Sequence, residues 1–159
     1  MNKNLYILCD FIISNLETNK ESAEYDACSF KLNTLSILSR TSKITPKKVG
    51  QFVTFWKRKD SNSPIQPFDS TDDIDFFVIN CQKDNLFGQF VFPKNELIAK
   101  GILSTDKKEG KRGFRVYPSW DKTTSKQAEK TQEWQLKYFI EIDIKKGIDL
   151  ERVKVLYNI

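Results

Sequence analysis

Basic side chains gather in two stretches of the sequence, and aromatic residues accompany both. Residues 40–59 hold seven lysines and arginines and no acid, and they include a tryptophan beside a lysine. Residues 94–115 hold seven more basic residues against three acids, and three aromatic residues lie around Arg115. Guanidinium and ammonium groups neutralise phosphates, while aromatic rings offer faces on which bases stack. Both stretches are therefore candidates for binding nucleic acid or a phosphorylated small molecule.

Two local patterns add to these candidates. Residues 110–113 read Gly-Lys-Arg-Gly, a compact turn that can bind an anion. Residues 127, 131 and 135 are four apart, so their polar side chains share one helix face, where they can hydrogen-bond a ligand or satisfy a neighbouring loop. The predicted ligand- or phosphate-binding residues are Arg40, Lys43, Lys57, Lys94, Lys111, Arg112, Arg115, Tyr117, Trp120, Gln127, Thr131 and Gln135. We expect them to converge on one face of a sheet; the alternative is that the lysines only solubilise the surface and protect sheet edges.

The sequence contains no histidine, which limits the kinds of active site that the protein can have. Catalytic triads, Cys-His pairs and histidine-bearing zinc sites are excluded, so acid–base work would fall to Asp, Glu, Lys or Tyr117. Residues 60–82 hold five acids and no basic residue, and such carboxylates can bind Mg²⁺. The following strand, however, lacks the acid that a PD-(D/E)xK nuclease needs two residues before Lys94. The aspartates are thus expected to form turns, and neither a metal site nor a cofactor is predicted.

The cysteines and the bulk composition indicate a folded protein of the reducing cytoplasm. Three cysteines lie far apart with no CxxC spacing, which predicts reduced core residues. The apolar residues near the N-terminus have helical spacing and lack a cleavage site, and no run approaches the roughly 20 apolar residues of a membrane span. The net charge of +5 is a moderate excess. We therefore expect a cytoplasmic protein with no membrane association.

The periodicity of apolar residues predicts an α+β fold, with one domain over residues 1–159. A mainly antiparallel sheet of about five to six strands should pack against an N-terminal helix and a C-terminal helix near 124–139. The expected helices are 5–16, 95–100 and 124–139, with a further short helix or turn near Asp149. The expected strands are near 30–32, 35–38, 50–57, 74–81, 87–92, 114–117 and 153–156.

Several sequence blocks resemble a known family. Residues 40–58 (RTSKITPKKVGQFVTFWKR), 88–94 (GQFVFPK), 110–120 (GKRGFRVYPSW) and 127–135 (QAEKTQEWQ) occur in this order. Together they resemble the bacterial MepB family, and the similarity covers roughly residues 24–142. No catalytic residues can be carried over from the resemblance, since the family has no assigned biochemical role; its name comes from a gene that neighbours a multidrug efflux pump.

Three classes of function remain open at the level of sequence. The first is a binding module for nucleic acid or a nucleotide. The second is an enzyme, with or without a metal, that acts on an anionic substrate and holds its charge with the arginines and lysines named above. The third is a regulatory protein–protein interaction module without a ligand. A shared site for the basic residues would favour the first two classes, and their dispersal over opposite faces would favour the third.

Overall fold

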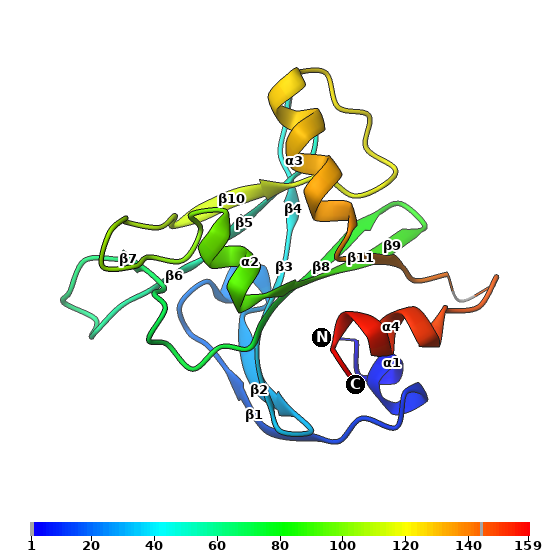
Figure 1. Ribbon diagram of the computed structural model, residues 1–159, viewed down its shortest axis with the longest axis horizontal. Helices are drawn as coiled ribbons and strands as arrows, with labels where there is room; N and C mark the ends of the chain where they lie inside the picture. Colours follow the sequence, from blue (N-terminus) through cyan, green and yellow to red (C-terminus); the bar gives the residue numbers. More distant parts are fainter. Residues whose placement is uncertain (1, 144) are drawn as a thin grey trace.

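The computed structural model describes residues 2–143 and 145–159 (Figure 1). Its helices are α1 (Lys3–Leu8), α2 (Lys94–Ala99), α3 (Lys126–Leu136) and α4 (Leu150–Leu156), with a 3₁₀ turn at Ala23–Tyr25. Its strands are β1 (Ile13–Thr18), β2 (Cys28–Leu32), β3 (Leu35–Thr41), β4 (Lys43–Ile44), β5 (Gln51–Thr54), β6 (Trp56–Lys57), β7 (Gln66–Pro67), β8 (Phe76–Lys83), β9 (Leu86–Pro93), β10 (Gly113–Val116) and β11 (Phe139–Glu141). The predicted α+β class is confirmed.

Six strands form the main sheet, in the order β1-β2-β3-β8-β9-β11. Four of the neighbouring pairs are antiparallel, while β3 and β8 run parallel. Parallel neighbours need a long crossover. Here the crossover between β3 and β8 carries β4, β5, β6 and β7. Strands β4 and β5 pair with β10 in a second sheet, in the order β10-β5-β4. The candidate site is built against this second sheet.

Apolar side chains cover both faces of the main sheet, because its central strands alternate core residues to either side. On β8, Phe76 and Val78 belong to a cluster that α1 and α4 cover, whereas Phe77 and Ile79 belong to a second cluster. The second cluster includes residues from β5, β10 and α2, and Trp134 of α3 packs against it. This second core fixes α2, α3 and β10 relative to one another.

The N-terminal helix predicted over 5–16 is only half correct. α1 ends at Leu8, and Asp10 adopts a left-handed conformation with φ of 59°, which turns the chain. Residues 13–18 then pair with β2 as the edge strand β1. The helical spacing of apolar residues continues through this segment, but Ile12 is exposed, so the spacing there does not mark a buried face. Pairing with an available sheet edge overrides the local pattern.

Near the C-terminus, the type of one element and the end of another differ from the sequence prediction. The predicted strand 153–156 is wrong, since these residues lie in α4. Asp149 caps this helix by accepting a hydrogen bond from the Arg152 amide at 3.0 Å, and Val153 and Leu156 are buried three residues apart on one helix face. The predicted helix 124–139 ends at residue 136, and Phe139 begins strand β11.

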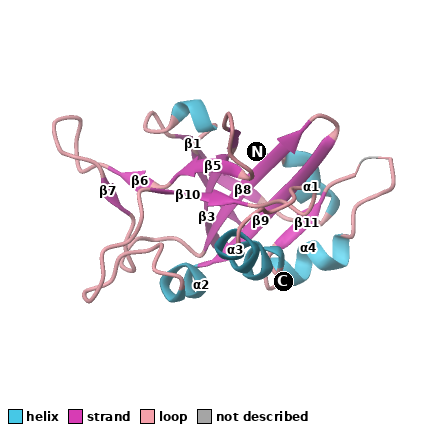
Figure 2. Cartoon of the chain, turned by 90° about the horizontal axis from the view of Figure 1, so that it is seen from above, coloured by secondary structure: helices cyan, strands magenta, loops and turns pink. Residues whose placement is uncertain are grey.

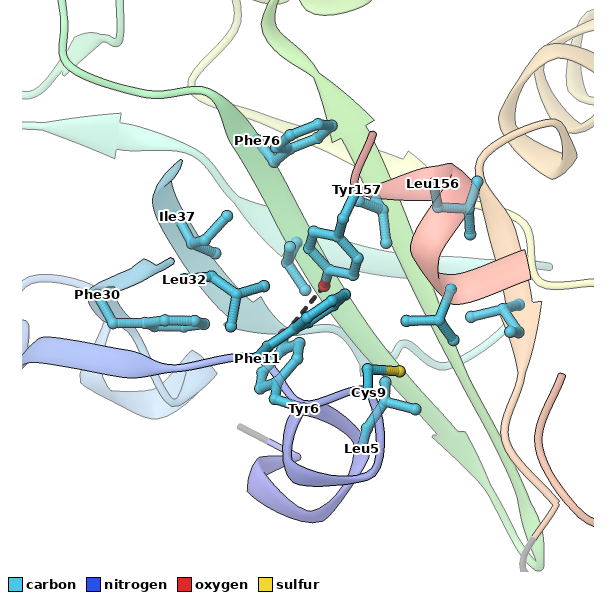
Figure 3. Close-up of a cluster of buried hydrophobic side chains, with 14 of the residues drawn as sticks. Leu5, Tyr6, Cys9, Phe11, Phe30, Leu32, Ile37, Phe76, Leu156 and Tyr157 are labelled. Carbon is cyan, nitrogen blue, oxygen red and sulfur yellow. Dashed lines mark hydrogen bonds between the residues drawn. The ribbon is translucent and has the colours of Figure 1, made fainter. Parts of the chain in front are cut away.

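A ring of buried hydrogen bonds ties both ends of the chain to the sheet. The Tyr157 hydroxyl donates to Gln89 Oε1 at 2.8 Å, so its only hydrogen is used there. The Tyr6 hydroxyl must therefore donate to Tyr157, 3.0 Å away, and it accepts from Gln89 Nε2 at 3.3 Å. Figure 3 shows the two tyrosines meeting among the apolar side chains of this core. Each polar atom of the ring thus has a partner in an otherwise apolar site.

The hydrogen bonds among Tyr6, Tyr157 and Gln89 predict that the free energy of unfolding falls at alkaline pH. Burial raises the pKa of Tyr6 to about 12 from the usual value near 10. The folded state therefore favours the neutral phenol, and its contribution is complete below pH 10 and lost as the pH rises from 10 to 12. Urea unfolding between pH 8 and 11 should show this fall, and Tyr6→Phe should make it shallower. Equal pH slopes in both proteins would contradict the assignment.

Candidate functional site

The structure gathers six of the twelve predicted binding residues in one cleft of about 400 Å³ between α3 and β10, hereafter the α3 cleft. These six are Lys111, Arg115, Tyr117, Gln127, Thr131 and Gln135. The other lining residues are Lys100, Ile102, Gly113, Phe114, Ser125, Ala128 and Trp134. Figure 2 shows α2 and α3 flanking the same side of β10. The site is therefore assembled from three segments that are separate in the sequence.

The glycine-bounded turn at 110–113 places Lys111 at the mouth of the cleft. Gly110 packs so tightly against the chain that a Cβ atom there would lie 2.2 Å from the carbonyl oxygen of Ile102. Its amide donates to Ser104 Oγ at 2.7 Å, and the Lys111 amide donates to the Ile102 carbonyl at 2.9 Å. A larger residue at 110 would push the turn away from residues 102–104. The turn thus depends on close backbone contact, which only glycine permits here.

Gln135 joins the two walls of the cleft. Its side chain is fully buried, its Oε1 accepts from the Tyr117 amide, and its Nε2 donates to the Arg115 carbonyl, both at 2.9 Å. These two backbone groups lie on the edge of β10 that no strand covers, so the amide replaces a missing strand neighbour. Gln132 similarly holds the following loop by donating to the carbonyls of Pro118 and Asp121. These glutamines position the site, whereas Gln127 and Thr131 remain at the cleft surface.

The cleft has a positive charge that no lining carboxylate offsets. Lys100, Lys111 and Arg115 are its ionic residues. Arg115 donates to the Val49 carbonyl at 3.3 Å and to the Thr45 hydroxyl, which hold the guanidinium in place without neutralising it. Among the described residues, no acid lies within ion-pair distance of Lys111 or Arg115, while Lys100 is 3.8 Å from Glu96. An anion is the ligand that this arrangement favours.

Aromatic rings form part of the same lining. Trp134 packs on Phe92, with ring centroids 5.3 Å apart, and the Lys100 ammonium lies 5.3 Å from the Trp134 centroid. Trp134 and Tyr117 are both half-buried, so each keeps part of its ring at the surface. A base can therefore stack or pack beside the cations that would bind its phosphate. The predicted list missed Lys100 and Trp134, although both lie within the basic and polar stretches noted in the sequence.

Arg40, by contrast, is a core residue. Its side chain is 1% exposed, Nη1 donates to the Ser39 carbonyl at 2.9 Å, and Nε has no partner among the described residues. Burial lowers the pKa of Arg40 to about 10, which still leaves it charged at neutral pH. It does not line the α3 cleft.

Lys57 and Lys94 meet at a different place, around Asp72. The Lys57 ammonium lies 2.9 Å from Asp69 and 2.7 Å from Asp72, and Lys94 donates to the Asp72 carbonyl at 2.7 Å. Asp69 has a pKa lowered to about 2, first by the Thr71 hydroxyl and then by Lys57. Because Lys57 is already paired with two carboxylates, its charge is compensated. Its ion pairs are structural, and its ammonium is not available to bind an anion.

The remaining predicted residues are also dispersed. The Lys43 ammonium lies 4.6 Å from the centroid of the Tyr25 ring. Arg112 pairs with Glu109 at 2.8 Å and does not line the α3 cleft. Trp120 packs edge-on against Phe139, and its indole nitrogen is buried without a partner among the described residues. The expectation of one shared site therefore holds for half of the set.

Neither a metal centre nor a membrane span stands out in the part of the chain that is described. No group of three or more metal-ligating side chains occurs among residues 2–143 and 145–159. Within the same ranges, every helix is too short or too polar to cross a membrane.

Comparisons with known proteins agree with the resemblance noted in the sequence. The family described as MepB-like matches residues 19–141, which include every residue that lines the α3 cleft. A solved structure described as the crystal structure of MepB is 36% identical with a TM-score of 0.79, covering 89% of this chain and 97% of that chain. A bacterial homing endonuclease aligns at 16% identity and a TM-score of 0.45, over 84% of this chain and 82% of that chain, which is too weak to indicate function. No curated protein matches the sequence.

The pairing of Lys57 predicts a stability effect without a binding effect. Lys57→Met keeps the aliphatic length but leaves Asp69 and Asp72 without their cation, so the free energy of unfolding should fall by about 1–2 kcal/mol. Lys154→Met is the matched control, because its partner Glu151 is largely exposed and the expected loss is within about 0.5 kcal/mol. Urea unfolding measures both. Should Lys57→Met instead weaken anion binding at unchanged stability, Lys57 would belong to a ligand site.

Proposed function

The chain belongs to the MepB-like family, and we propose that its α3 cleft binds a phosphate-bearing ligand, either a free nucleotide or a nucleotide unit of nucleic acid. The observation that carries this proposal is the pair of cations Lys111 and Arg115, which have no acid within ion-pair distance among the described residues, in a cleft whose lining contains no carboxylate. Lys100 adds a third charge, partly compensated by Glu96 at 3.8 Å. Like charges held together around a cavity repel one another, and a bound anion relieves that repulsion.

The dimensions and chemistry of the cleft suit one nucleotide. Small-ligand pockets usually enclose about 300–1,000 Å³, and this one is about 400 Å³. Arg115 uses two of its five N–H donors on the protein, which leaves three for phosphate oxygens. Lys100 and Lys111 add point charges, and the rings of Trp134 and Tyr117 offer apolar surface to a base. Gln127 and Thr131 supply hydrogen-bonding groups on the opposite wall.

Binding fits the cleft better than catalysis does. General acid–base chemistry most often uses histidine or a carboxylate. The chain has no histidine, and the cleft lining has no carboxylate. A catalytic role there would fall to a lysine or to Tyr117. The proposal is therefore one of recognition, in which the positive charge and the rings hold the ligand.

Arg115→Gln and Lys111→Gln should each weaken the binding of a fluorescein-labelled oligonucleotide, by roughly tenfold at low salt for Arg115 because it offers several donors. The plot of log affinity against log salt has a negative slope, and each substitution should make that slope shallower by about 0.7 for a single strand. Fluorescence anisotropy between 50 and 200 mM salt measures both quantities. Unfolding in urea checks that Arg115→Gln, which loses contacts to the turn at 45–49, remains folded.

Lys3→Gln serves as the matched control, because Lys3 lies on α1, away from the α3 cleft. Its affinity and salt slope should equal those of the unchanged protein. The proposal fails if the unchanged protein binds neither AMP nor the oligonucleotide, or if Lys3→Gln weakens binding as much as Arg115→Gln does.

A further inference from the structure

A second basic cleft lies next to the first. It encloses about 410 Å³, and its ionic lining residues are Lys47, Lys48, Lys83, Lys122 and Asp121. Asp121 is already engaged, since its side chain is 9% exposed and lies 3.5 Å from the Lys83 ammonium. Among the described residues, no acid lies within ion-pair distance of the other three lysines. The second cleft therefore has an excess positive charge, as the α3 cleft does.

The ring of Tyr117 lies at the boundary between the two clefts. Tyr117 lines the α3 cleft and Gly50 lines the second one. They pack so closely that a Cβ atom on Gly50 would lie 2.7 Å from two carbons of the Tyr117 ring. Arg115 crosses the same boundary, because it lines the α3 cleft and donates to the Val49 carbonyl in the wall of the second. These two contacts, Tyr117 with Gly50 and Arg115 with Val49, join the linings of the two clefts.

The two clefts together are longer than a single nucleotide. In the register of the second sheet, Val116 pairs with Gln51, so Gly50 lies just beyond the end of β10. Three residue steps along β10 cover about 10 Å at roughly 3.3 Å per residue. Lys111 lies before this strand and Lys48 beyond its far end. Phosphates advance about 3.4 Å along each strand of duplex DNA, so the cations span at least about three of them.

We infer that the two clefts form one continuous track and that its occupant is a polynucleotide rather than a mononucleotide. This inference rests on the proposed function of the α3 cleft and names its ligand class more closely. The backbone of the polynucleotide passes Lys100 and Lys111, crosses Arg115 and Tyr117, and continues past Lys48 and Lys122. A free nucleotide fills the first cleft alone and leaves the charge of the second without a partner.

Lys47 offers a variant that removes charge without straining the fold. Its backbone has φ of 65°, a left-handed conformation that costs a non-glycine residue roughly 1–2 kcal/mol. Lys47→Gly removes both the cation and this strain, so the variant should be at least as stable as the unchanged protein. A loss of binding in it cannot be attributed to unfolding. Lys48→Gln and Lys122→Gln complete the set.

The test varies the length of the ligand and the charge of the second cleft, and measures the affinity for each combination. Binding of AMP and of single-stranded and duplex oligonucleotides of 2, 4, 8 and 12 units is measured for the unchanged protein and for the triple variant Lys47→Gly, Lys48→Gln, Lys122→Gln. Affinity should rise with length up to at least 4 units. The triple variant should bind AMP as before. For a single-stranded 12-mer, its negative slope of log affinity against log salt should become shallower by about 2, or 0.7 per lysine. The duplex arm shows which form of nucleic acid binds more tightly.

The outcomes separate this inference from the proposed function. If AMP and the 12-mer bind equally well and the triple variant behaves like the unchanged protein, the continuous track is wrong while the α3 cleft still binds a nucleotide. If neither AMP nor any oligonucleotide binds, the proposed function and the track both fail. If Lys3→Gln reduces the magnitude of the salt slope by about 0.7, one third of the change expected for the triple variant, binding is diffuse and the track is again wrong.

Discussion

The buried amide of Gln135 is the contact on which the site depends. β10 is the end strand of its sheet, and its outer edge presents backbone groups that would cost about 1–3 kcal/mol each if buried without a partner. Gln135 supplies one acceptor and one donor to two of these groups, the amide of Tyr117 and the carbonyl of Arg115. Helix α3 is thereby held at a fixed position beside β10.

Charge pairing, rather than the density of basic residues in the sequence, distinguishes the cations that are free to bind. Lys57 lies in the stretch with no acid of its own, yet the fold brings Asp69 and Asp72 to it. Lys111 and Arg112 are neighbours in sequence, but Glu109 pairs with Arg112 and leaves Lys111 facing the cleft. All three acidic partners were visible in the sequence. Their pairing was not, because it depends on turns and on a crossover that bring distant segments together.

The sequence predicted the fold where local patterns and tertiary packing agree. The hairpin of β8 and β9 and the helix that begins at Lys126 lie close to the predicted ranges 74–81, 87–92 and 124–139. The predictions failed where a sheet edge or a buried helix face decided the outcome, as in β1 and α4. Six of the predicted binding residues share one cleft because the segment around β10 and helix α3 each carry several of them in one continuous stretch. Arg40 was predicted to bind a ligand but lies buried on β3, and the burial of a single strand residue depends on tertiary packing that the local sequence does not show.

The three tryptophans allow one direct test of the central claim, because they occupy three different environments. Trp134 lines the α3 cleft, Trp120 packs against Phe139, and Trp56 lies beside Arg58 with the guanidinium 5.3 Å from its ring. Their indole N–H signals can be followed in a ¹⁵N NMR titration with a short oligonucleotide. The account predicts that the Trp134 signal shifts in proportion to the ligand bound while the Trp56 signal stays in place. A titration that moves Trp56 and leaves Trp134 unchanged would contradict it.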